Sequence, residues 1–135
     1  MPPTLMDTRA KIVPRQEVVS RLAALSTNGS RIVTAGGWFD VLQAAHCQRL
    51  SEAKHEHARL VVFVYDDRPN RRGVLDAWSR AQMVAALAAV DYVVICDQAD
   101  AASLAARSNL PPPLSIEEAM PRDIVADVLQ RHQAQ

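Results

Sequence analysis

The 135-residue sequence has little of the material that several classes of protein require. Its two cysteines, Cys47 and Cys96, provide neither a disulfide framework nor a spaced set of zinc ligands, so we expect no metal site. No apolar run approaches the length needed to cross a bilayer, and the N-terminus lacks the apolar core of a secretory signal. We therefore expect a cytoplasmic protein with no membrane segment.

An excess of charge of one sign is also missing. Lys and Arg together number 15, Asp and Glu together number 15, and the formal net charge is zero. The overall field therefore does not favour nucleic acid or an anionic membrane surface. Aromatic residues make up only 4% of the chain, which leaves few rings on which nucleic-acid bases could stack. We expect no nucleic-acid partner and no membrane partner.

The sequence does contain alternating strand-like and helix-like segments, and its length suits one domain over residues 1–135. The apolar runs 31–35, 60–65 and 92–96 predict buried parallel strands, with 31–35 central and the other two flanking it. Helices are expected at 16–25, 40–57, 79–89 with a capping box of Ser79 and Gln82, 100–108 and 121–135. This order predicts an α/β fold, a Rossmann-like doubly wound parallel sheet with helices on both faces.

The turn after the first strand is the first place to look for a ligand, because ligands of parallel α/β sheets bind beyond the carboxyl ends of the strands. Gly36 and Gly37 let backbone amides approach a phosphate, and the helix expected near Asp40 directs its free N–H groups to the same place. The dinucleotide and P-loop glycine patterns are both absent. The same residues also fit a plain turn, and Trp38 beside them fits either packing or stacking on a base.

Residues 31–54 resemble the start of the cytidylyltransferase-like nucleotidyltransferases, in particular the nucleotidyltransferase domain of bacterial ADP-heptose synthases and the glycerol-3-phosphate cytidylyltransferases. The likeness covers residues 11–98 and leaves 99–135 as a divergent C-terminal segment, too short for the later strands of that family. The signature is G-x-F-D-x-L-H-x-G-H, and its matches here are Gly37, Phe39, Asp40, Leu42 and His46.

The resemblance implies a set of site residues and ligands. It places His46 and Gln43 at the catalytic positions and assigns nucleotide or phosphate binding to Gly36, Gly37, Phe39, Asp40, Arg80 and Arg122. It also implies transfer of NMP from an NTP to a phosphorylated sugar or polyol, with Mg²⁺ accompanying the NTP if the protein is active. Relatives of this kind commonly pair, and the apolar stripe of the expected last helix also favours a homodimer.

Three departures from the signature bear on activity. Gln43 replaces the first histidine and cannot become cationic, and Ala45 adds a methyl group where the family keeps glycine. The hydroxyl-rich helix start of the family corresponds here to residues 119–123, where Arg122 is the remaining phosphate ligand. Three function classes stay open: a working nucleotidyltransferase, a non-catalytic nucleotide- or sugar-phosphate-binding module, and an oligomeric interaction domain without the ligand. The departures favour weak or lost catalysis.

Overall fold

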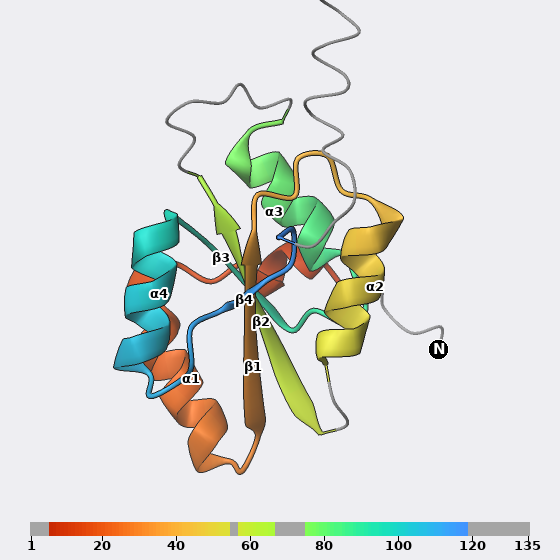
Figure 1. Cartoon of the computed structure of the whole chain (residues 1–135). Helices are drawn as coiled ribbons and strands as arrows, with labels where there is room; N and C mark the ends of the chain where they lie inside the picture. The colour runs from red at the N-terminus through yellow and green to blue at the C-terminus, as the bar shows by residue number, and fades with distance from the viewer. Residues whose placement is uncertain (1–5, 55–56, 67–74, 119–135) are drawn as a thin grey trace, which may run out of the picture.

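Helices cover both faces of a parallel four-stranded sheet (Figure 1). The structure is a computed structural model that describes residues 6–54, 57–66 and 75–118. In chain order its elements are η1 (Thr8–Lys11), η2 (Arg15–Glu17), α1 (Val18–Thr27), β1 (Arg31–Gly37), α2 (Ala44–Ala53), β2 (Ala58–Tyr65), α3 (Ala77–Ala85), β3 (Tyr92–Cys96), α4 (Gln98–Arg107) and β4 (Leu114–Ser115).

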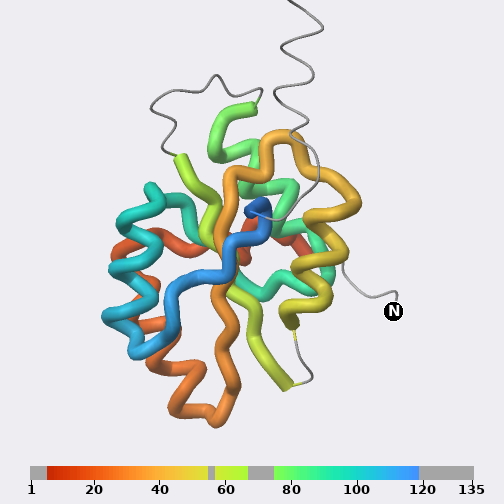
Figure 2. The backbone as a smooth tube through the Cα atoms, viewed as in Figure 1, coloured from red at the N-terminus to blue at the C-terminus, as the bar shows by residue number. Residues whose placement is uncertain are grey.

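The strand order is β3-β2-β1-β4, and every pairing is parallel. The predicted Rossmann-like doubly wound sheet is therefore confirmed. The prediction that β2 and β3 both flank β1 is wrong, because β2 lies between β1 and β3. The other neighbour of β1 is β4, a strand that the sequence pattern did not predict (Figure 2). Only two residues long and exposed, β4 has no apolar run to reveal it.

Alternation along β2 builds one apolar core on each face of the sheet. Leu60, Val62 and Val64 join residues of α2 and α3, whereas Val61, Phe63 and Tyr65 join residues of α1 and α4. Successive side chains of a strand point to opposite faces, so a strand that is buried on both sides reads as one continuous apolar run. Figure 1 shows the same division, with α1 and α4 on one side of the sheet and α2 and α3 on the other.

Each described α-helix begins two to four residues from its predicted start: α1 at 18 instead of 16, α2 at 44 instead of 40, α3 at 77 instead of 79 and α4 at 98 instead of 100. The helix expected over 40–57 is α2, which starts only at Ala44, because Phe39 has a positive φ of 55° and Gln43 is still extended. The capping box expected at Ser79 and Gln82 does not cap α3. Asp76 is the N-cap, and its carboxylate accepts a hydrogen bond of 2.7 Å from the Ser79 N–H inside the helix.

The segment after β3 carries the chain back to the edge of β1. α4 begins after its N-cap Asp97, and the chain then passes three consecutive prolines before β4 pairs with Ala35 and Gly36. The Ile116 N–H also donates to the Gly36 carbonyl at 3.1 Å. The predicted helix at 121–135, the segment 119–123 and its Arg122 lie outside the described residues.

Candidate functional site

The carboxyl end of β1 brings three hydrogen-bond donors to one carboxylate. The Trp38 N–H donates to Glu117 Oε1 at 2.7 Å, and the Phe39 N–H donates to Glu117 Oε2 at 3.0 Å. His46 Nε2 lies 2.9 Å from the same Oε2 atom. Consecutive backbone N–H groups form an anion-binding concavity where one of the residues has a positive φ. Phe39, with a φ of 55°, is that residue here. The turn therefore binds an anion, here one supplied by the chain itself.

Two glycines make room for this arrangement. A Cβ atom on Gly37 would lie 3.0 Å from Glu117 Oε1, closer than side-chain contacts normally come. A Cβ atom on Gly36 would lie 2.1 Å from the Tyr65 hydroxyl oxygen, and Tyr65 is buried. Tyr65 in turn packs edge to face with Trp38, with ring centroids 5.1 Å apart. Trp38 thus packs against a strand end, the first of the two roles that the sequence left open.

His46 reaches the carboxylate from the start of α2. His46 is buried, and its ring packs against Phe39, with ring centroids 5.2 Å apart. The Gln43 N–H donates to His46 Nδ1 at 2.9 Å in a capping box at the helix start. Because Nδ1 accepts this bond, the neutral ring carries its proton on Nε2, which then donates to Glu117.

The hydrogen bonds hold Glu117 in its ionised form. Burial alone would raise the pKa of its carboxyl group, but the bonds from His46, Trp38 and Phe39 outweigh burial and lower that pKa below the ordinary 4.5. The Glu117 side chain is still 25% exposed, whereas the His46 side chain is 2% exposed. The site therefore consists of the Nε2 N–H group of His46 and two backbone N–H groups that face a charged carboxylate at the edge of solvent.

Arg80 and Asp40 lie beneath the turn and support its backbone. Arg80 Nη1 donates to the carbonyls of Trp38 and Tyr65 at 2.7 Å each, and Arg80 Nε donates to the Leu75 carbonyl at 3.1 Å. Asp40 Oδ1 accepts from the Leu75 N–H at 3.2 Å, and its Oδ2 lies 4.0 Å from Arg80 Nε. Both side chains are buried. These contacts give them a supporting role, and phosphate binding by either side chain remains a prediction.

The structure thus brings Gly37, Phe39 and His46 together around Glu117, with Gly36, Gln43, Asp40 and Arg80 next to them. Glu117 is the residue that the sequence analysis missed. It lies 71 residues after His46 and belongs to no periodic pattern or family motif that could have marked it. Its role follows from the pairing of β4 with β1, which places it at the end of β1.

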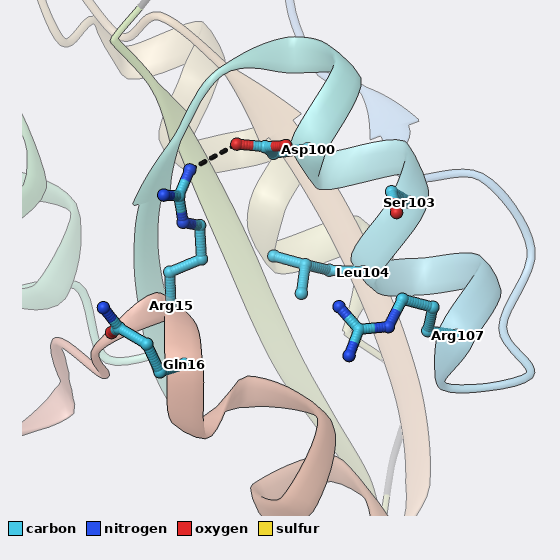
Figure 3. Close-up of a pocket in the computed structure, with 6 residues that line it drawn as sticks. All are labelled: Arg15, Gln16, Asp100, Ser103, Leu104 and Arg107. Carbon is cyan, nitrogen blue, oxygen red and sulfur yellow. Dashed lines mark hydrogen bonds and ion pairs between the residues drawn. The ribbon is translucent and has the colours of Figure 1, made fainter.

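A hollow with a volume of about 220 Å³ lies between η2 and α4, away from the end of β1 (Figure 3). Arg15 pairs there with Asp100, and both side chains are more than 40% exposed. The remaining lining residues are Gln16, Ser103, Leu104 and Arg107, of which only the apolar Leu104 is buried. With no buried polar side chain in its lining, this hollow is a weaker candidate than the end of β1.

Within residues 6–54, 57–66 and 75–118, no three His, Cys, Asp or Glu side chains are grouped so that they could hold a metal ion. In the same ranges no helix is long and apolar enough to span a membrane.

Comparison with known proteins identifies the family. A family model described as cytidylyltransferase-like matches residues 34–133. The Bifunctional protein HldE of Koribacter versatilis is 38% identical over 96 residues, which is 67% of this chain and 20% of that protein. The protein of the same name from Chromohalobacter salexigens is 35% identical over 96 residues, which is 65% of this chain and 20% of that protein.

The chain therefore spans about a fifth of the length of the curated relatives that it matches. The matched family region contains the turn, α2 and Glu117, and thus the whole of the site described above. The resemblance expected from the signature around His46 is confirmed by both the family model and these relatives. Together with the doubly wound parallel sheet, these matches show that the chain belongs to the cytidylyltransferase-like family.

Proposed function

We propose that this domain binds the phosphate groups of a nucleotide, or of a sugar or polyol phosphate, at the carboxyl end of β1. The observation that carries the proposal is the convergence of the Trp38 N–H, the Phe39 N–H and His46 Nε2 on one anion. A phosphate oxygen accepts hydrogen bonds from such donors at the same distances as a carboxylate oxygen does. The Bifunctional protein HldE relatives support a ligand of this class through their family.

We further propose that transfer of NMP from an NTP is weak or lost in this protein. Transfer requires donors that stabilise the negative charge developing on the phosphoryl group. Gln43 occupies the position of the first family histidine and supplies only a neutral amide. The Gln43 N–H already bonds to His46 Nδ1, so the ring directs only Nε2 toward the anion. Both features indicate that the start of α2 binds an existing phosphate anion better than it stabilises the negative charge that develops on the phosphoryl group during transfer.

Mg²⁺ would enter the site bound to the NTP. No cluster of carboxylates within the described residues offers a site for a resident ion. A triphosphate itself can carry the ion and reach the turn with it. If turnover occurs, Mg²⁺ would neutralise charge on the phosphate oxygens, and the protein's part would be to position the phosphates through the two amides and His46.

Calorimetric titration with CTP and with ATP, each with and without Mg²⁺, tests the binding proposal. We expect the native protein to bind at least one of them with a Kd of about 1 mM or tighter. His46→Ala should weaken this binding, whereas Gln48→Ala, an exposed change on the same helix, should leave it unchanged. The proposal fails if neither nucleotide binds to the native protein or to the Gln43→His/Ala45→Gly variant.

We also propose that the protein is a homodimer, on the family resemblance and the apolar stripe expected at 121–135. Light scattering at micromolar concentration should give about twice the chain mass of 14.8 kDa. A mass near 14.8 kDa would contradict the dimer without affecting the binding proposal.

A further inference from the structure

We propose that Glu117 determines what the site can bind, because its carboxylate occupies the phosphate position and an anionic ligand must displace it. This inference rests on the proposed function, which makes phosphate the anion for which Glu117 competes.

All three converging donors are used by the carboxylate. Both of its oxygens take part, with Oε1 on the Trp38 N–H and Oε2 on the Phe39 N–H and His46 Nε2, at 2.7 to 3.0 Å. A phosphate that used the same donors would have to place its oxygens where these two oxygens lie. Two anions at that separation would also repel each other, because like charges in contact at a binding site oppose binding. Glu117 and a phosphate therefore exclude each other.

The backbone on either side explains why Glu117 fills the site so well. Ser115 pairs with Gly36, the Ile116 N–H donates to the Gly36 carbonyl, and the Ile116 side chain is buried. Glu117 is thus held beside the turn as an intramolecular ligand, which needs no loss of translational freedom to bind. Its pKa is lowered although burial alone would raise it, so the hydrogen bonds of the site favour the charged form of Glu117.

Displacement of Glu117 need not disturb the sheet. The Glu117 side chain is 25% exposed, so solvent reaches one side of it, and Glu117 lies outside β4, whose pairing with β1 involves Leu114 and Ser115. Glu118 next to it is exposed. That neighbour provides a matched control, because its substitution removes the same charge from the same segment without emptying the site.

The experiment compares pyrophosphate binding to the native protein, Glu117→Ala and Glu118→Ala, followed by calorimetry and by the NMR amide signals of Trp38 and Phe39. We expect Glu117→Ala to bind pyrophosphate roughly ten- to a hundred-fold more tightly than the native protein, from the relief of like-charge contact. Loss of the carboxylate should move the two amide proton signals upfield, and pyrophosphate should return them downfield. Glu118→Ala should match the native protein in both measurements.

The inference would be overturned if Glu117→Ala binds pyrophosphate no more tightly than the native protein does. It would also be overturned if pyrophosphate does not move the Trp38 and Phe39 amide signals of Glu117→Ala. If Glu117→Ala does not fold, Glu117→Gln is judged by the same criteria, because an amide of the same shape carries no charge to repel the ligand. Failure of the proposed function has a different signature: neither CTP nor ATP binds to any variant although pyrophosphate binds to Glu117→Ala. Nucleotide binding that is equally tight in the native protein and in Glu117→Ala would instead support the proposed function and refute the role of Glu117.

Discussion

Replacing Arg80 with methionine removes the buried guanidinium that holds the turn after β1 against β2 and the start of α3. Three carbonyls, of Trp38, Tyr65 and Leu75, would lose a charged donor, and the Asp40 carboxylate would lose its nearby cation. An unsatisfied buried carbonyl costs about 1–3 kcal/mol, and a broken buried ion pair costs about 3–5 kcal/mol. These costs overlap, so we expect a total loss of about 3–5 kcal/mol in the free energy of unfolding.

Urea denaturation followed by circular dichroism measures this loss. Arg21→Met is the matched control, because Arg21 is exposed and lies 3.9 Å from Glu17 in an i,i+4 pair, worth about 0.5 kcal/mol or less. Arg80→Lys keeps the charge but not the planar fork, so its stability should fall between those of the native protein and Arg80→Met. A loss of less than about 1 kcal/mol in Arg80→Met would refute the supporting role assigned to Arg80.

Three further predictions concern neighbouring features. Gly36→Ala should lower the free energy of unfolding by about 1–3 kcal/mol, since the new Cβ atom meets the buried Tyr65 ring, and an unchanged urea midpoint would contradict this. A thiol reagent at about pH 8 should modify Cys47 in the native protein but not Cys96, whose pKa is raised to about 12 chiefly by burial and then by nearby aspartates; mass spectrometry of the labelled peptides gives the answer. The lowered pKa of Glu117 stabilises the fold above its ordinary pKa of 4.5, and this contribution disappears as the pH falls through the folded value. The native protein should therefore lose more stability on acidification than Glu117→Gln does. Parallel curves of the free energy of unfolding against pH would contradict a stabilising role of the hydrogen bonds to the Glu117 carboxylate.

Much of the fold was predictable because parallel strands that are buried on both faces leave continuous apolar runs. The runs at 60–65 and 92–96 became β2 and β3, and the alternating helices covered both faces. The neighbours of β1 were not predictable in the same way. Pairing partners depend on long-range packing, and the strand that occupies the second edge of β1 is only Leu114–Ser115, which carries no apolar pattern.

The candidate site was predictable only in part. The glycine turn and His46 could be recognised from local sequence, because a family signature fixes their spacing along one stretch of chain. Asp40 and Arg80 contact each other and backbone groups beneath the turn, a supporting role that local sequence did not indicate, and their binding of phosphate stays a prediction. Glu117 could not be found from sequence, since one of two adjacent glutamates in a largely exposed segment resembles any solvated glutamate until β4 places it beside the turn.

Pyrophosphate release from CTP or ATP, with Mg²⁺ and a sugar or polyol phosphate, is the most direct test of the proposal that NMP transfer is weak or lost in this protein. The comparison is between the native protein, His46→Ala and Gln43→His/Ala45→Gly, with Gln48→His/Ala44→Gly as a control of the same composition on α2. The variant restores one donor to the developing charge, the imidazole introduced by Gln43→His, and such a donor is worth roughly 2.7–4 kcal/mol. We expect native turnover near background and below that of Gln43→His/Ala45→Gly, or no turnover in either protein with tighter triphosphate binding in that variant. Robust native turnover that His46→Ala abolishes would contradict this expectation.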